Sequence, residues 1–129
     1  MLLGQQVWVS GGAGQAIDFV RALDVPAYMN GASRGMLPQD DPHHFDRTRS
    51  DAFKEADVIL IVGTPFDFRM GYGKRISEKA TLVQIDQSYS TVGKNRDISL
   101  GLAGDPGSIL AAVAQAASGR IDDGAPAAY

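Results

Sequence analysis

The residues of this chain that could do chemistry are mostly aspartates and glycines that follow short apolar runs. In a parallel α/β sheet, ligands bind beyond the carboxyl ends of the strands, where the chain turns into helices. A carboxylate at such an end can accept hydrogen bonds from ribose hydroxyls, and a glycine lets the backbone approach a phosphate. The residues that fit this description, and that we take as candidate ligand-binding residues, are Gly4, Asn30, Gly31, Gly63, Asp67, Arg69, Asp86 and Asp105.

Two of these aspartates also have an ordinary structural interpretation. Aspartate is a favoured residue at helix N-caps and in turns, so Asp86 and Asp105 could each act as a cap. Taken one at a time, each is better explained as a cap than as a ligand. Only their joint position at predicted strand ends favours a nucleotide-shaped crevice.

A glycine-rich segment at residues 11–14 precedes a helical pattern and invites comparison with the dinucleotide-binding fingerprint. The third small residue of the fingerprint is replaced by Ile17, and no acidic residue ends the next strand about 20 residues further on. We therefore interpret the segment as the loop that opens a helix. A phosphate cradle is the less favoured alternative.

The sequence offers no constellation of catalytic or metal-ligating residues. His43 and His44 are adjacent, so their side chains point apart, and a metal site needs three or four convergent ligands. The chain has no cysteine, and no serine or threonine has the neighbours of an activated nucleophile. We expect no catalytic residue and no metal ligand in this chain.

The strongest structural signal is the aliphatic run at residues 56–63, which ends in a glycine. Such an unbroken run is typical of a strand in a parallel sheet with helices on both faces. We expect it to be a fully buried central strand, flanked by strands at residues 1–3 and 81–85. A short strand at residues 25–29 should lie toward one edge, and residues 98–102 repeat the strand pattern more weakly.

Helical periods lie between these strands. Apolar residues recur at helical spacing over residues 13–23, a shorter helix begins near Thr48, and the pair Asp105 and Pro106 opens a last helix. Strands that alternate with helices predict an α/β fold, a doubly wound parallel sheet of five or six strands, Rossmann-like and in three layers.

Length and composition agree with one globular domain. The chain has 129 residues, of which 44% are hydrophobic and 21% charged. A net charge of -3 without a basic stripe argues against nucleic acid as a partner. No apolar run approaches the roughly 18 residues that cross a bilayer, so we expect no membrane partner and a cytoplasmic location.

Several segments form a pattern that is more specific together than any one of them is alone. They cover residues 26–38, 56–63, 66–73, 84–86 and 92–96, and the pattern ends near Gly104 and Asp105. In order and spacing they resemble the central domain of thiamine-diphosphate enzymes. The likeness is greatest to acetolactate synthase and its relatives, including the oxalyl-CoA decarboxylase and 2-hydroxyacyl-CoA lyase group.

The resemblance implies a larger parent enzyme with three α/β domains in one polypeptide. In this family the first domain activates the cofactor with a glutamate, and the third binds magnesium and diphosphate. Thiamine diphosphate and Mg²⁺ would thus be held by domains absent here, and this chain would be a non-catalytic central domain. Its partners would be the pyrimidine- and diphosphate-binding domains, in a homodimer or homotetramer.

The resemblance also bears on a nucleotide in the crevice. Flavin-binding members carry an Arg-Phe-Asp-Asp-Arg motif after the central strand, whereas this chain has Pro65, Phe66, Asp67, Phe68 and Arg69 there. Replacement of the first arginine and the second aspartate argues against flavin. Other members hold ADP in this crevice, and some leave it empty. We expect an empty or weakly occupied crevice, with FAD and ADP as candidate ligands; the alternative is a free-standing nucleotide-binding α/β module.

Domain boundaries follow from the same comparison. Family central domains begin with a full strand that ends in glycine, and only three residues precede Gly4 here. The resemblance implies a central domain at residues 1–118 with a truncated first strand, and a linker toward an absent cofactor-binding domain at residues 119–129. Residues 7–9 then belong to the loop after the first strand. In the alternative of an independent domain, residues 7–10 are its first strand.

Overall fold

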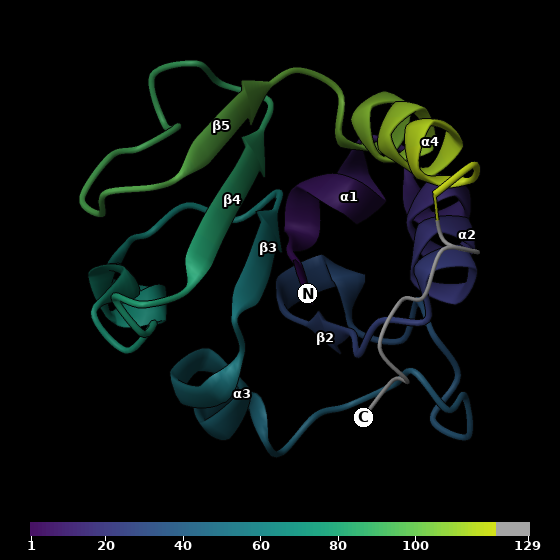
Figure 1. The fold of residues 1–129 in the computed structure, drawn as a ribbon, viewed down its shortest axis with the longest axis horizontal. Coiled ribbons are helices and arrows are strands. Elements are labelled where there is room, and N and C mark those ends of the chain that lie inside the picture. Colours follow the sequence, from purple (N-terminus) through teal and green to yellow (C-terminus); the bar gives the residue numbers. More distant parts are fainter. Residues whose placement is uncertain (121–129) are drawn as a thin grey trace.

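Five parallel strands form a single sheet in the computed structural model, which describes residues 1–120. The strand order is β2-β1-β3-β4-β5, so β3 is central and β2 lies at one edge (Figure 1). This confirms the predicted doubly wound α/β sheet and the predicted neighbours of the central strand. The strands are β1 (Leu2–Leu3), β2 (Tyr28–Met29), β3 (Val58–Val62), β4 (Thr81–Asp86) and β5 (Leu100–Ala103).

Helices cover both faces of the sheet. α2 (Ala13–Leu23) and α4 (Pro106–Ala117) pack on each other and lie on one side, as Figure 1 shows. α3 (Arg49–Glu55) and the 3-10 helix η2 (Phe68–Gly73) lie on the other. The sequence predicted α2 and the starts of α3 and α4 correctly, because their apolar spacing and caps are local signals.

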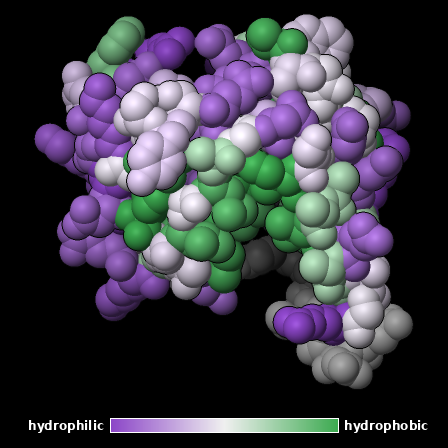
Figure 2. Space-filling model, turned by 90° about the horizontal axis from the view of Figure 1, so that it is seen from above, coloured by the Kyte–Doolittle hydropathy of each residue, from purple (hydrophilic) through white to green (hydrophobic). Residues whose placement is uncertain are grey.

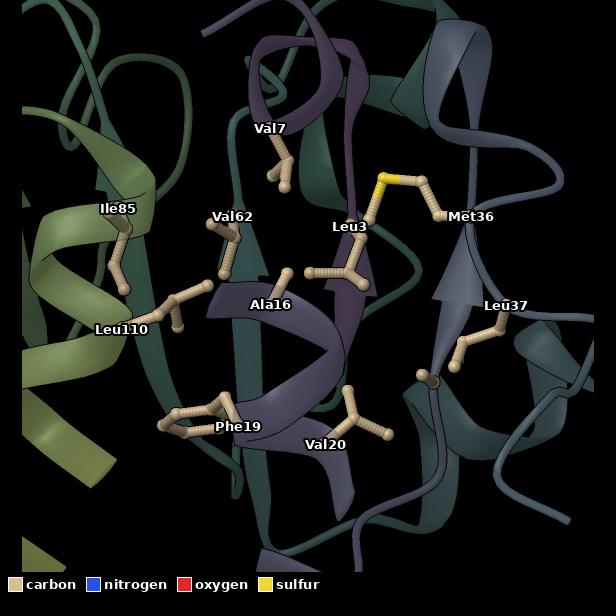
Figure 3. Packing of buried hydrophobic residues seen from close by; sticks show 11 residues of the cluster. Leu3, Val7, Ala16, Phe19, Val20, Met36, Leu37, Val62, Ile85 and Leu110 are labelled. Carbon is tan, nitrogen blue, oxygen red and sulfur yellow. The ribbon is translucent and has the colours of Figure 1, made fainter. Parts of the chain in front are cut away.

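The two faces of the sheet support two apolar clusters. Val62 and Ile85 point toward α2 and α4, where they meet Phe19, Val20 and Leu110 (Figure 3). The alternate residues of β3 point to the other side and pack under α3 and η2. These are Ile59 and Ile61, which join Phe53, Phe66, Met70 and Leu82. Alternation along each strand therefore gives the three-layer arrangement.

Residues 7–9 are helical rather than strand-like. β1 stops at Leu3, and α1 (Gln5–Val9) begins directly after it. The alternative that residues 7–10 form a first strand is therefore wrong, and the loop assigned to residues 7–9 is in fact a short helix. The strand preference of Val7, Trp8 and Val9 is overridden by tertiary contacts. Val7 packs in the core, whereas Trp8 and Val9 are exposed.

The expectation that the central strand is fully buried is wrong at its amino end. Val58 is 57% exposed, whereas Ile61 and Val62 are completely buried. On the same face, Leu100 of β5 is 52% exposed. α2 and α4 cover β1 and the carboxyl half of β3. They leave Val58 and Leu100 uncovered, and we call these two residues the open apolar row. Figure 2 shows green apolar side chains gathered in the middle of one face of the molecule.

Two remaining expectations concern the ends and surroundings of the chain. Most of the proposed linker at residues 119–129 lies outside the described residues, which end at Arg120. Within residues 1–120, no helix combines the length and the apolar character that crossing a membrane requires.

Candidate ligand-binding edge of the sheet

The predicted site residues follow the carboxyl ends of successive strands. Gly4 follows β1, Asn30 follows β2, Gly63 follows β3, Asp86 ends β4, and Asp105 comes two residues after β5. Because the strands are parallel and adjacent, these residues share one edge of the sheet. Whether this edge binds a ligand stays a prediction.

Gly4 and Gly63 let two strand ends approach each other closely. A Cβ atom on Gly4 would lie 2.4 Å from the carbonyl oxygen of Gly63, which is too close for any other residue. Gly63 has φ of +71° and lies against Gln6. The space that these glycines leave free is thus already occupied by the chain itself.

Asp86 is buried and uses its carboxylate to join α1 to β4. Gln6 donates from Nε2 to Oδ2 at 3.0 Å, and the Ser88 amide donates to Oδ1 at 2.8 Å. The other end of the Gln6 side chain accepts from the amide of Gln87 at 3.1 Å. The sequence contained no signal for Gln6, because its partners are some 80 residues away. Asp86 is thereby held in a turn.

Asp105 acts as the N-cap of α4. Its carboxylate accepts from the amide and the hydroxyl of Ser108, each at 2.8 Å. The amide hydrogen bond, followed by that of the hydroxyl, lowers the pKa of Asp105. The contacts of the Asp105 side chain are therefore those of a helix N-cap.

Asp67 and Arg69 pair with each other. The guanidinium of Arg69 donates to Asp67 Oδ2 at 2.6 Å from Nη2 and at 3.0 Å from Nε, and its amide donates to Oδ1 at 2.9 Å. The side-chain hydrogen bond of Arg69 is the main reason that the pKa of Asp67 is lowered. Arg69 thus satisfies a neighbouring carboxylate, although its side chain is exposed.

Asn30 and Gly31 lie at the end of the edge strand. Asn30 Nδ2 lies 3.8 Å from the sulfur of Met70, a weak contact for an amide. Gly31 has φ of +54°, and a side chain there would meet Gln5 of α1. Beneath them, Ser33 donates its hydroxyl proton to the carbonyl of Gly4, which holds this loop against β1.

The glycine-rich segment and the two histidines have structural roles. Gly12 precedes α2 and lies against Gly107 of α4. A Cβ atom added to Gly12 would lie 3.1 Å from the Cα atom of Gly107. This segment opens a helix, as the sequence predicted. His43 bridges Asp41 and Asp24 at 2.9 and 2.8 Å. His44 bonds from Nδ1 to the carbonyl of Pro38 at 3.0 Å.

The described residues do not fit a tightly held flavin or a metal. The family arginine is replaced by Pro65, and Arg69, the remaining candidate for a phosphate, is engaged with Asp67. Within residues 1–120, no three His, Cys, Asp or Glu side chains gather as a metal site requires. The polar groups of this edge mainly hold the loops of the domain to one another.

Comparison with known proteins places the chain in a family. Residues 1–113 match the family described as "Thiamine pyrophosphate enzyme, central domain". The chain therefore belongs to this family, and the resemblance read from the sequence is confirmed.

Curated relatives agree with this assignment. The chain is 36% identical over 114 residues to the acetolactate synthase large subunit IlvG of Mycobacterium tuberculosis, covering 88% of this chain and 21% of that protein. It is 33% identical over 105 residues to 2-hydroxyacyl-CoA lyase 2 of Danio rerio, covering 78% and 17%. The chain thus spans about a fifth of the length of these relatives.

A solved structure supports the fold. An enzyme from Mycobacterium smegmatis described as thiamin diphosphate-dependent superposes with a TM-score of 0.70 at 20% identity. The match covers 88% of this chain and 24% of that one.

Proposed function

We propose that this chain is the non-catalytic central domain of a thiamine-diphosphate-dependent enzyme of acetolactate synthase or 2-hydroxyacyl-CoA lyase type. Its role is structural, and its sheet edge binds FAD or ADP weakly or not at all. Family membership and the names of its relatives support the first part. In the parent, thiamine diphosphate and Mg²⁺ would be held by other domains.

One observation supports weak or absent nucleotide binding: the carboxylates at this sheet edge already form hydrogen bonds with other residues of the chain. Asp86 is occupied by Gln6 and Ser88, and Asp67 by Arg69. A nucleotide would have to displace these contacts before it gained its own. Loss of a charged hydrogen bond at Pro65 costs a further ~1.5–3 kcal/mol, which is a ten- to hundredfold loss of affinity or more.

The open apolar row supports packing against another part of the parent. Val58 and Leu100 expose more than half of their surface on the same face of the sheet. Large exposed apolar areas mark interaction sites, and parallel sheets are normally covered on both faces. We infer that a further domain of the same polypeptide, or a second subunit of a homo-oligomer, covers this row.

A free-standing nucleotide-binding module is the second candidate. It is favoured by exposed aromatic residues at the same edge, Trp8 on α1 and Tyr89 after β4. Aromatic rings of this kind can stack on a base. Binding of ADP or FAD to the isolated chain at low micromolar concentration would support this candidate and contradict the structural role.

The experiment for the structural role uses the full-length enzyme that contains this domain. The purified protein is denatured, and released flavin and adenine nucleotide are quantified by chromatography against protein concentration. We expect both to be far below one equivalent per chain. A yellow protein that releases one flavin per chain would show that the loss at Pro65 is compensated elsewhere.

A further inference from the structure

A hollow of about 470 Å³ lies on the outer side of the edge strand β2. None of the candidate edge residues lines it. Its walls come from the end of β2, from the loop that connects β2 to α3, and from the beginning of α3. The lining residues that matter here are Tyr28, Arg34, His44, Phe45, Arg47 and Arg49.

Positive charge predominates in this hollow. Three arginines line it, and Asp46 is the one carboxylate among the lining residues. Within residues 1–120, the guanidinium groups of these three arginines take part in no hydrogen bond or ion pair, unlike those of Arg21 and Arg69, which each pair with an aspartate. Guanidinium groups left without acceptors in one concave place favour an anionic ligand.

The walls of the hollow are held in place by the fold. Residues 43–45 run parallel to β2, where the amide of Phe45 donates to the carbonyl of Ala27 at 2.9 Å. The hydroxyls of Tyr28 and Thr48 are 2.8 Å apart. Arg49 lies over the ring of Phe53, with its guanidinium carbon 5.9 Å from the ring centroid. These contacts orient the site before a ligand arrives.

We propose that this hollow binds the phosphate group of a small phosphate ester. Guanidinium groups match the oxygens of a phosphate in a bidentate manner, which favours phosphate over a monovalent anion. Phe45 is 37% exposed and packs against the buried Tyr28 with ring centroids 5.9 Å apart, so its ring offers an aromatic wall to the body of the ester. The site does not depend on the proposed function, because it lies outside the edge discussed above.

The test uses the full 129-residue chain and two probes, inorganic phosphate and phenyl phosphate, followed by NMR chemical-shift titration. We expect both probes to shift the amides of residues 44–50, and phenyl phosphate to bind more tightly. Arg47→Gln should weaken binding of both probes about tenfold or more, since it removes a charged hydrogen-bond donor. Phe45→Ala should remove the advantage of phenyl phosphate and leave inorganic phosphate unchanged.

Arg75→Gln serves as the matched control, because Arg75 is exposed and does not line the hollow. Thermal melts would verify that each variant is folded. Equal weakening by Arg47→Gln and Arg75→Gln would overturn the proposal, since it would indicate screening of general surface charge. The proposal would also be overturned if 10 mM probe caused no shift at residues 44–50, because this concentration is of the order of the dissociation constants of weak phosphate sites.

Discussion

At the scale of single residues, glycines determine how closely the chain can approach itself. Gly4→Ala would place a Cβ atom 2.4 Å from a backbone oxygen of Gly63, which cannot move without disturbing β3. We expect a loss of ~1–3 kcal/mol or more in the free energy of unfolding, measured by urea denaturation. Gly14→Ala is the control.

Gly14 lies within α2 with no atom within 4 Å of the added Cβ position, so alanine there should stabilise the protein by up to ~1 kcal/mol. If both substitutions had the same effect, the close approach of β1 and β3 at Gly4 would be wrong.

His43 should make stability depend on pH. The hydrogen bond with Asp41 is the main cause that raises the pKa of His43 above 6.5, and Asp24 adds to it. Because the folded-state pKa is raised, the stabilisation is fully present below about pH 6.5 and is lost as the pH rises through the folded-state value. Melting temperatures from pH 6 to 9 should therefore fall less steeply for His43→Gln than for the unmodified chain.

The stabilisation that Asp41 contributes changes with pH in the opposite direction. Its pKa is lowered to about 2, mainly by the hydrogen bond from Arg21. Its stabilisation is present above about pH 3.8 and lost as the pH falls toward 2. His43→Gln should leave the acid part of the profile largely intact. Identical profiles for the two proteins above pH 6.5 would contradict the role of His43.

At the scale of elements, the two ends of β3 should respond differently to the same change. Ile61→Asp buries an unpaired charge between two layers, which costs several kcal/mol against a total stability of roughly 5 to 15. We expect this variant to be unfolded by circular dichroism. Val58→Asp changes a side chain that is 57% exposed, so it should remain folded. A cooperatively melting Ile61→Asp variant would contradict the placement of β3.

Local signals explain which elements could be predicted from the sequence. α2 has five apolar residues at helical spacing, and α4 has Asp105 and Pro106 at its start, so both could be located without tertiary information. α1 could not be, because Val7, Trp8 and Val9 have strand-like composition and become helical only where β1 ends against Gly63. The exposure of Val58 depends on how far α2 and α4 extend over the sheet, which no local pattern reports.

The position of the candidate residues at the sheet edge could be predicted from the sequence, but their contacts could not. Aspartates after apolar runs did locate the carboxyl edge, since parallel strands align their ends. The partners of those aspartates could not be foreseen, because Gln6 reaches Asp86 from a distant part of the chain and Arg69 turns back on Asp67. In the structure, these contacts occupy the carboxylates of Asp86 and Asp67.

At the scale of the whole molecule, the parallel sheet and the family match identify a thiamine pyrophosphate enzyme central domain. The chain spans 17% to 21% of the two curated relatives described above, which leaves most of each relative outside the match. In the proposed function, the cofactor of the parent is bound by those other parts. This is the central claim, and it can be tested on the chain alone.

The most direct measurement is isothermal titration calorimetry of the 129-residue chain with thiamine diphosphate in the presence of Mg²⁺. The proposed function predicts no binding tighter than about millimolar, because within residues 1–120 no three His, Cys, Asp or Glu side chains gather to hold the magnesium ion that accompanies the diphosphate. A saturable heat with a micromolar dissociation constant would contradict it and would show that this chain holds the cofactor itself.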